Sequence, residues 1–333
     1  MVMNPEVKKL IDKAKVIVTG IGDIDRDTII SLLDIEPGSE ECEYLGKTAR
    51  EVARINSNNQ AKVGTSIGLD LCPCSASCEF CALGSKWGLV KENCEISDEH
   101  VIEMIRTRFE KGNIQFTLRT TEYYSLERLA GLARRIRKEI PGKYFLTANT
   151  GELTIEDVRM LKEAGFTGAY HVPRLGEGRY TPFSTEERLA TIRNIKEGGL
   201  MLATGLDPIG IEFSNEELAD QIILLRSLKP AGICTMRRES VKGTPLGDME
   251  EISETRLAQI AAVIRMSFKG SVAVHPAIQL GFDWGANNAA AEIGATPREE
   301  ESDMNEWLYR HDVIEDMFRK AGYDFGSFDD FSR

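Results

Sequence analysis

Short apolar runs alternate with amphipathic segments of helical length along most of the chain. This alternation is typical of β-α units that place parallel strands around a common axis. Eight of the runs read as strands, and eight is the number of strands that closes a TIM-type barrel. The runs are Val63–Leu69, Ile114–Leu118, Tyr144–Thr147, Gly168–His171, Met201–Gly205, Gly232–Thr235, Ser271–Val274 and Ala289–Ile293. The pattern therefore predicts an α/β fold, a TIM-type (βα)8 barrel whose functional loops follow the carboxyl ends of the strands.

The chain outside the predicted barrel shows the helical spacing of Ile, Leu and Val. We expect a helical N-terminal extension over residues 1–57, the barrel over 58–300 and a C-terminal helical tail over 301–333, with a helix at Asp303–Ala321. One barrel domain is favoured over two domains because no linker or low-complexity tract interrupts the chain. Acidic residues following a hydroxyl side chain predict helix starts at Ser97, Thr154 and Ser184.

The net charge of the chain disfavours two kinds of binding partner. The 333 residues include 41 Lys and Arg against 53 Asp and Glu, so the formal net charge is −12. Such an acidic chain is poorly suited to the phosphate backbone of a nucleic acid or to an anionic membrane. No apolar run approaches the roughly 18 residues of a membrane span, and the amino-terminal residues alternate in charge rather than forming a signal core. We expect a cytoplasmic protein with a small-molecule substrate.

Four of the seven cysteines lie close together after the first predicted strand, at Cys72, Cys74, Cys78 and Cys81. This crowding suits metal ligation in a reducing compartment better than a disulfide framework. Three thiolates in one loop can each bind one iron of a [4Fe–4S] cluster and leave the fourth iron open to a small molecule. Structural zinc usually needs four ligands in two pairs, and no second pair lies at a suitable spacing. The triad can begin at Cys74 or at Cys72, and the sequence leaves both possibilities open.

The spacing Cys74-x3-Cys78-x2-Cys81, with the aromatic Phe80 before the last cysteine, resembles the motif of the radical S-adenosylmethionine (SAM) superfamily. The resemblance implies that the open iron chelates SAM and that an electron from the cluster cleaves SAM to a 5′-deoxyadenosyl radical. Cys74, Cys78 and Cys81 would then be catalytic cluster ligands, with Cys72 as the alternative to Cys74. It also implies an anaerobic enzyme and an external one-electron reductant such as flavodoxin or ferredoxin.

Further residues resemble the subgroup of biotin synthase, HydE and methylornithine synthase. The resemblance covers about residues 60 to 297, including Gly243-Thr244-Pro245-Leu246 and the late Gly285-Ala286-Asn287. It implies that Glu122, preceded by Thr121 where relatives have glycine, accepts a hydrogen bond from the SAM amino group. It also implies contacts to the SAM ribose and carboxylate from the fourth predicted strand and its loop, and a glycine-bearing turn at the end of the fifth. The implied residues are His171, Arg174, Arg179 and Gly205.

The chain departs from biotin synthase at the strands that carry that enzyme's second cluster, where it has no cysteine. We expect Cys234 to be a packed core thiol, and Cys42 and Cys94 to lie on the surface. Within the subgroup the chain is most similar to the HmdB family, also called HcgA, which is linked to biosynthesis of the iron-guanylylpyridinol cofactor of [Fe]-hydrogenase. The alternatives are a methylornithine synthase-like mutase, a biotin synthase-like enzyme without the second cluster, and a non-catalytic iron–sulfur carrier.

A small polar substrate is expected inside the barrel, where polar side chains at strand ends can hydrogen-bond to it. The candidates are Arg119, Tyr123, Tyr124, Thr147, Asn149, Arg237, Arg238, His275 and Gln279.

Overall fold

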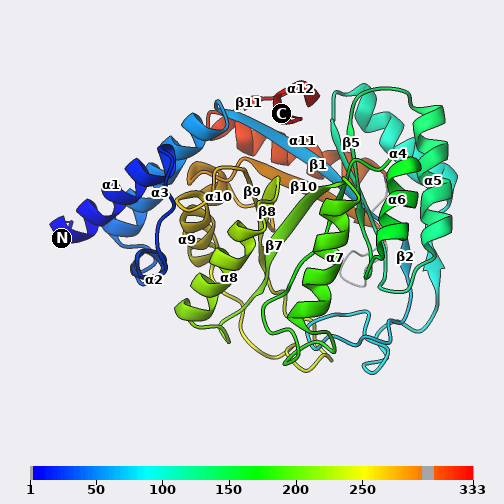
Figure 1. Cartoon of the computed structure of the whole chain (residues 1–333), viewed down its shortest axis with the longest axis horizontal. Helices are drawn as coiled ribbons and strands as arrows, with labels where there is room; N and C mark the ends of the chain where they lie inside the picture. Colours follow the sequence, from blue (N-terminus) through cyan, green and yellow to red (C-terminus); the bar gives the residue numbers. More distant parts are fainter. Residues whose placement is uncertain (1–2, 295–303, 333) are drawn as a thin grey trace.

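The computed structural model describes residues 3–294 and 304–332, and within them eight parallel strands close into a barrel surrounded by helices (Figure 1). The strand order is β10-β9-β8-β7-β6-β5-β4-β1, and pairing of β10 with β1 closes the ring. The strands are β1 (Gln60–Gly68), β4 (Gln115–Arg119), β5 (Phe145–Asn149), β6 (Gly168–Tyr170), β7 (Met201–Ile209), β8 (Gly232–Arg237), β9 (Ser271–His275) and β10 (Asn288–Gly294). The predicted TIM-type (βα)8 fold is confirmed, with every predicted strand in place.

A helix follows each barrel strand and packs on the outside of the sheet. These helices are α4 (Asp98–Glu110), α5 (Leu126–Glu139), α6 (Ile155–Glu163), α7 (Thr185–Glu197), α8 (Asn215–Ser227), α9 (Glu254–Arg265), α10 (Gln279–Asp283) and α11 (Met304–Lys320). The predicted helix starts are found as side-chain caps at Ser97, Thr154 and Ser184. The predicted C-terminal helix corresponds to α11, and its expected first residue, Asp303, lies outside the described residues.

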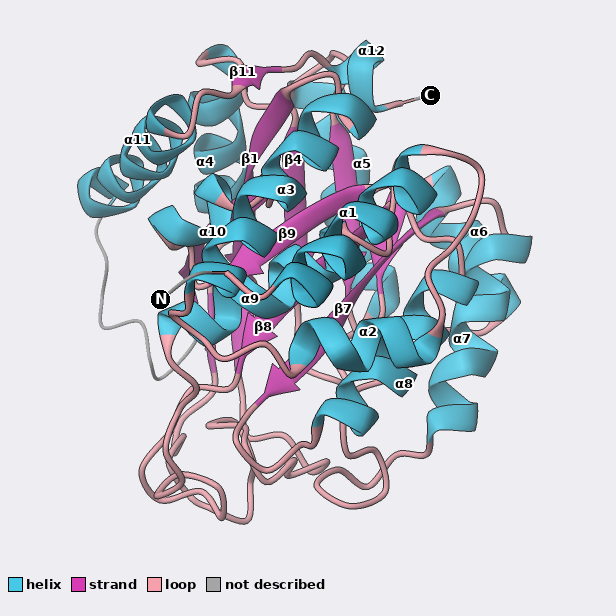
Figure 2. Cartoon of the chain, turned by 90° about the vertical axis from the view of Figure 1, so that its left-hand side faces the viewer, coloured by secondary structure: helices cyan, strands magenta, loops and turns pink. Residues whose placement is uncertain are grey.

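Three helices precede the barrel: α1 (Pro5–Thr19), α2 (Arg26–Leu33) and α3 (Glu40–Asn56). They pack against α8, α9 and α10 on one side of the molecule (Figures 1 and 2). The inner face of α3 includes Cys42, Leu45, Ala49 and Val52, spaced three or four residues apart. The expectation of a surface position for Cys42 was therefore wrong, because this spacing turns the thiol inward despite its acidic neighbours.

The two ends of the barrel differ in what covers them. The long loops that follow the strands gather at the carboxyl end, at the bottom of Figures 1 and 2. The amino end is covered by the last segment of the chain, β11 (Asp324–Phe325) and α12 (Phe328–Phe331), with β11 paired to Gln60 and Ala61 of β1. No helix in the described part of the chain is long and apolar enough to cross a membrane.

Strand β7 is longer than predicted. The run Met201–Gly205 was expected to end in a glycine-bearing turn, but β7 continues to Ile209, with Ile209 paired to Arg237 of β8. Gly205 thus lies inside a strand, and a Cβ at this position would lie 2.3 Å from the hydroxyl oxygen of Tyr170. Glycine is needed there because the tyrosine occupies the space of a side chain, not because the chain turns.

Candidate functional site

The cysteine loop begins after β2 (Asp70–Leu71), which pairs with β3 (Cys94–Glu95) at the carboxyl end of the barrel. Backbone hydrogen bonds fold the loop on itself: the Cys74 N–H donates to the Leu83 carbonyl at 2.7 Å, and the Cys81 N–H donates to the Cys78 carbonyl at 2.8 Å. All seven cysteines of the chain are free thiols. The loop is therefore shaped by its own backbone and not by a disulfide.

Three of the loop thiols are electrostatic neighbours. Burial raises the pKa of the Cys78 thiol to about 12, the Arg174 guanidinium opposes this rise, and the thiols of Cys81 and Cys74 add to it. Cys72 has different surroundings, because its pKa is raised by burial and then by Asp70, Glu95 and Cys94. The structure thus places Cys74 with Cys78 and Cys81, and places Cys72 beside the β2–β3 pair.

The number of loop thiols bears on the kind of metal site that they could form. Among the described residues, the one group of three His, Cys, Asp or Glu side chains with all ligand atoms within 4.8 Å of one another is His311, Asp312 and Glu315. The three loop thiols are not such a group, and three thiolates alone would leave a structural zinc site, which usually has four protein ligands, incomplete. A [4Fe–4S] cluster fits this set, since each thiolate would bind a different iron.

The cysteine loop is joined to two neighbouring loops through one residue, Glu79. Its backbone N–H donates to the Tyr180 carbonyl at 2.8 Å, and its carbonyl accepts from the Leu246 N–H at 3.2 Å. Tyr180 lies in the loop after β6, and Leu246 lies in the loop after β8. The cyan, green and yellow loops at the bottom of Figure 1 are thus fixed to one another.

Arg174 connects this loop cluster to the barrel interior. Its Nε lies 3.3 Å from Oδ1 of the buried Asp207, and the Tyr170 hydroxyl donates to Oδ2 of Asp207 at 2.9 Å. Burial disfavours the charge, but Asp207 and the Cys78 thiol outweigh it and raise the pKa of Arg174 above its usual range. The second candidate, Arg179, lies elsewhere: its guanidinium is half-exposed and pairs with Glu217 of α8 at 3.3 Å.

Glu122 belongs to a charge network centred on Arg188 of α7. This buried guanidinium lies 3.4 Å from Glu122 and 3.0 Å from the fully buried Glu177, and it also pairs with Glu152. The three carboxylates come from the loops after β4, β6 and β5, respectively. One arginine therefore fixes three strand-end loops, and we name this set the Arg188 network.

His171 adjoins the same network. Its side chain is 4% exposed, and its Nε2 lies 3.3 Å from Oε2 of Glu152. Burial disfavours the Glu152 carboxylate, but His171, Thr191 and Arg188 together lower the pKa of Glu152 to about 2. Thr121, the neighbour of Glu122, is fixed by β2, because its backbone N–H donates to Asp70 at 2.8 Å.

Sequence reasoning identified Glu122, His171 and Arg174 but missed the residues that position them. Arg188, Glu152, Glu177 and Asp207 are scattered along the chain and form no motif. Asp70 was the one accessible clue, since a polar residue directly after a barrel strand lies at the functional end.

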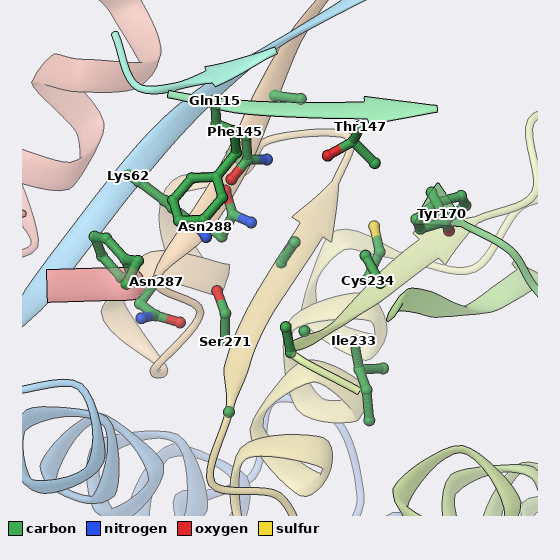
Figure 3. Close-up of a pocket in the computed structure, with 18 of the residues that line it drawn as sticks. Lys62, Gln115, Phe145, Thr147, Tyr170, Ile233, Cys234, Ser271, Asn287 and Asn288 are labelled. Atoms are coloured by element: carbon green, nitrogen blue, oxygen red, sulfur yellow. The ribbon is translucent and has the colours of Figure 1, made fainter. Parts of the chain in front are cut away.

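The barrel encloses a cavity of about 510 Å³ (Figure 3). The interior of a TIM-type barrel is normally filled by bulky branched side chains. Here several inward positions are small, including Gly168, Ala203, Gly232, Ala273 and Ala290. The cavity therefore follows from the sequence of the strands.

The substrate candidates divide into three sets. The cavity is lined by Thr147, Asn149 and His275. Arg119 lies 3.5 Å from Glu292, and Glu292 is also a lining residue. Arg238 is instead buried against Glu212 at 2.9 Å, and Gln279 on α10 donates to the Met317 carbonyl at 3.1 Å. The prediction that these last two residues face the substrate was wrong. The remaining candidates, Tyr123, Tyr124 and Arg237, are not among the residues that line the cavity.

Cys234 of β8 lines the cavity as well, so it is not simply a packed core thiol (Figure 3). Burial, Asp207 and Glu292 raise its pKa.

No family model matches the chain. Among curated proteins it is 27% identical to the biotin synthase of Magnetococcus marinus over 201 residues, which are 58% of this chain and 62% of that enzyme. It is 26% identical to the biotin synthase of Chlorobaculum tepidum over 253 residues, covering 72% and 75% of the two chains. Among solved structures, methylornithine synthase (PylB) superposes with a TM-score of 0.80 at 18% identity, covering 97% of this chain and 98% of that chain.

Proposed function

We propose that this chain, a radical SAM enzyme related to biotin synthase and methylornithine synthase, holds one [4Fe–4S] cluster and transforms a small polar molecule inside its barrel. One observation carries this proposal: three neighbouring thiols lie in the loop at the carboxyl end of a barrel that holds a cavity and whose strand-end loops hold charged side chains. A protein that only carries electrons has no use for such a cavity.

The cluster ligands in this proposal are Cys74, Cys78 and Cys81. The proximity of Cys74 to Cys78, and the separate surroundings of Cys72, support Cys74 as the first ligand. Thiol ligands must lose their protons to bind iron, so cluster loading should release protons from this loop. Phe80, between the second and third ligands, would pack beside the cluster.

The proposed SAM contacts are side chains held in place by their neighbours. Glu122 is 15% exposed and pairs with Arg188 through one oxygen, so its carboxylate can accept a hydrogen bond from the SAM amino group. Arg174 lies beside Cys78 and would bind the SAM carboxylate, with Asp207 and Tyr170 fixing its position. Thr121, His171 and Gly205 would support these contacts, whereas Arg179 is directed toward α8. When bound, the cluster supplies the electron that cleaves SAM reductively, and an external flavodoxin or ferredoxin would supply that electron.

For the pathway, we propose formation of the pyridinol part of the iron-guanylylpyridinol cofactor of [Fe]-hydrogenase. The support is the resemblance to the HmdB family together with a barrel whose described strands carry one cysteine, Cys234. A second cluster like that of biotin synthase would need several thiols in the barrel. Methylornithine synthase-like mutase chemistry is the second candidate, favoured by the match of its fold over nearly the whole chain.

Anaerobic reconstitution followed by iron and sulfide analysis tests the cluster assignment. We expect about four irons per chain, and loss of the cluster in Cys78→Ala and Cys81→Ala. The matched control is Cys94→Ala, because Cys94 is exposed and lies outside the triad. About eight irons per chain, or tightly bound zinc, would refute a single cluster.

Incubation with SAM and a reductant tests the chemistry and then the pathway. We expect 5′-deoxyadenosine and methionine, and deuterium transfer into 5′-deoxyadenosine from a labelled pyridinol precursor. Label transfer from dethiobiotin with formation of biotin, or from lysine with formation of methylornithine, would contradict the proposed pathway and support the corresponding alternative.

A further inference from the structure

A lysine lies at the end of the cavity farthest from the cysteine loop. Lys62 belongs to the amino-terminal part of β1 and lines the cavity. Its ammonium group lies 5.3 Å from the ring centre of Phe145 and 4.6 Å from that of Phe331 in α12. Within the described part of the chain, no carboxylate lies at ion-pair distance from it. Aromatic faces attract a cation but do not neutralise its charge.

The acidic side chains that line the same cavity have other partners. Glu292 lies near Arg119 and His275, at 3.5 and 3.9 Å. Asp330 caps α12 by accepting from the Ser327 N–H at 2.8 Å. Burial lowers the pKa of Lys62 to about 8, so in most molecules the Lys62 amine is still protonated at neutral pH. The amino end of the cavity therefore holds a cation whose charge no neighbouring acid balances.

Two polar atoms close to this end also lack partners. Ser271 Oγ and Asn288 Oδ1 are buried without a hydrogen bond, and both residues line the cavity. Asn288 is in register with Lys62 across the β1–β10 pair. Figure 3 shows Lys62, Phe145, Asn288 and Ser271 on one side of the cavity, with Cys234 and Tyr170 on the other. Buried polar atoms in native proteins usually have partners, and an anionic ligand in this cavity would give the Ser271 hydroxyl an acceptor.

We propose that the amino end of the barrel cavity is a subsite for the carboxylate end of the substrate, with Lys62 as its counter-charge. This inference rests on the proposed function and narrows its substrate class to an elongated carboxylate. Lys62 and Ser66 are four residues apart on β1, which corresponds to roughly 13 Å along a strand. The carboxylate would thus lie far from the cysteine loop, and the reacting carbon would lie at the other end of the molecule. The Ser271 hydroxyl would donate a hydrogen bond to it.

The test measures binding of simple probes by calorimetry to the anaerobically reconstituted full chain, without SAM or reductant. Hexanoate is the carboxylate probe, hexyl phosphate is the phosphate probe and hexanol is the neutral control. We expect hexanoate to bind, hexanol not to bind, and Lys62→Met to weaken hexanoate binding by about tenfold or more. Lys62→Arg should retain much of the affinity. Lys143→Met is the matched control, because Lys143 is a surface lysine near the same end of the barrel that pairs with Asp329.

A stability measurement separates binding from a structural role. Because Lys62 has no acidic partner among the residues that the structure describes, Lys62→Met leaves no carboxylate unpaired and should melt at the same temperature as the wild-type chain or higher. Equal hexanoate affinity in the wild-type and Lys62→Met chains, or a lower melting temperature of the variant, would overturn the proposal. Tighter binding of hexyl phosphate than of hexanoate would overturn the carboxylate assignment. Since these measurements involve no SAM, their failure is distinguishable from failure of SAM cleavage.

Discussion

Replacing Arg188 tests whether one buried guanidinium fixes the loops at the functional end of the barrel. The change is Arg188→Met, which retains a flexible apolar chain of similar reach and removes the charge. In the folded protein Arg188 is 2% exposed and contacts three carboxylates, and Glu177 is 0% exposed. The substitution therefore leaves at least one carboxylate buried without its cation.

The expected loss of stability follows from the burial of each carboxylate. Breaking a buried ion pair by removing one partner typically costs about 3–5 kcal/mol. The lower end of this range applies here, because Glu177 keeps two hydrogen bonds after the substitution. It still accepts from the Thr181 hydroxyl, and it accepts from the backbone N–H of Arg174 at 3.2 Å. Glu152, at 32% exposure, can regain water. We therefore expect Arg188→Met to lower the free energy of unfolding by about 3 kcal/mol.

Urea denaturation followed by circular dichroism measures this loss. Arg193→Met is the control on the same helix, because the Arg193–Glu186 pair is 61% and 74% exposed and should contribute less than about 1 kcal/mol. Adding Glu177→Gln to Arg188→Met should recover part of the stability by removing the unpaired charge. If Arg188→Met and Arg193→Met were equally stable, the account of the Arg188 network would be refuted.

Three further predictions concern the same end of the barrel. Cys74→Ala should abolish iron binding while Cys72→Ala retains about four irons per chain by iron analysis, and the reverse would assign Cys72 as the ligand. Because the pKa of Glu152 is lowered to about 2, its carboxylate stabilises the fold above its ordinary pKa, and this contribution is lost as the pH falls from about 4.5 toward 2. In Glu152→Gln, the free energy of unfolding should fall by roughly 1–2 kcal/mol less over that pH range than in the wild-type chain. An equal fall in the two chains would contradict the lowered pKa of Glu152. Gly205→Ala should destabilise the chain by about 1–3 kcal/mol in thermal unfolding, and should cost less in a Tyr170→Phe background, whereas additive effects would contradict the close contact.

The eight strands and the capped helices could be predicted because their signals are local. A buried strand is a short apolar run, and a helix start is a hydroxyl residue followed by acidic ones, as at Ser184. The cysteine loop could be found for the same reason, since its ligands lie within one short segment.

The Arg188 network could not be predicted, because its members meet only when the barrel closes. Nothing in the sequence around Arg188 distinguishes it from Arg193 on the same helix, although one is buried and the other is exposed. Arg237 and Arg238 present a similar difficulty. Adjacent residues point in different directions, and only the fold shows that Arg238 turns to Glu212. Lys62 was missed because the sequence does not show whether a lysine on a strand faces the barrel interior.

The strand that leads into the cysteine loop is also the strand at which the ring closes. β1 pairs with β4 on one side and, through Lys62 to Gly68, with β10 on the other, although β10 is the last barrel strand in the chain. Contacts between segments so distant in sequence form slowly during folding. The cysteine loop also contacts the loops after β6 and β8, so we expect it to reach its final surroundings late in the assembly of the barrel. Iron uptake during refolding should accordingly lag behind helix formation. Metal would then be incorporated only into chains whose barrel has nearly finished folding.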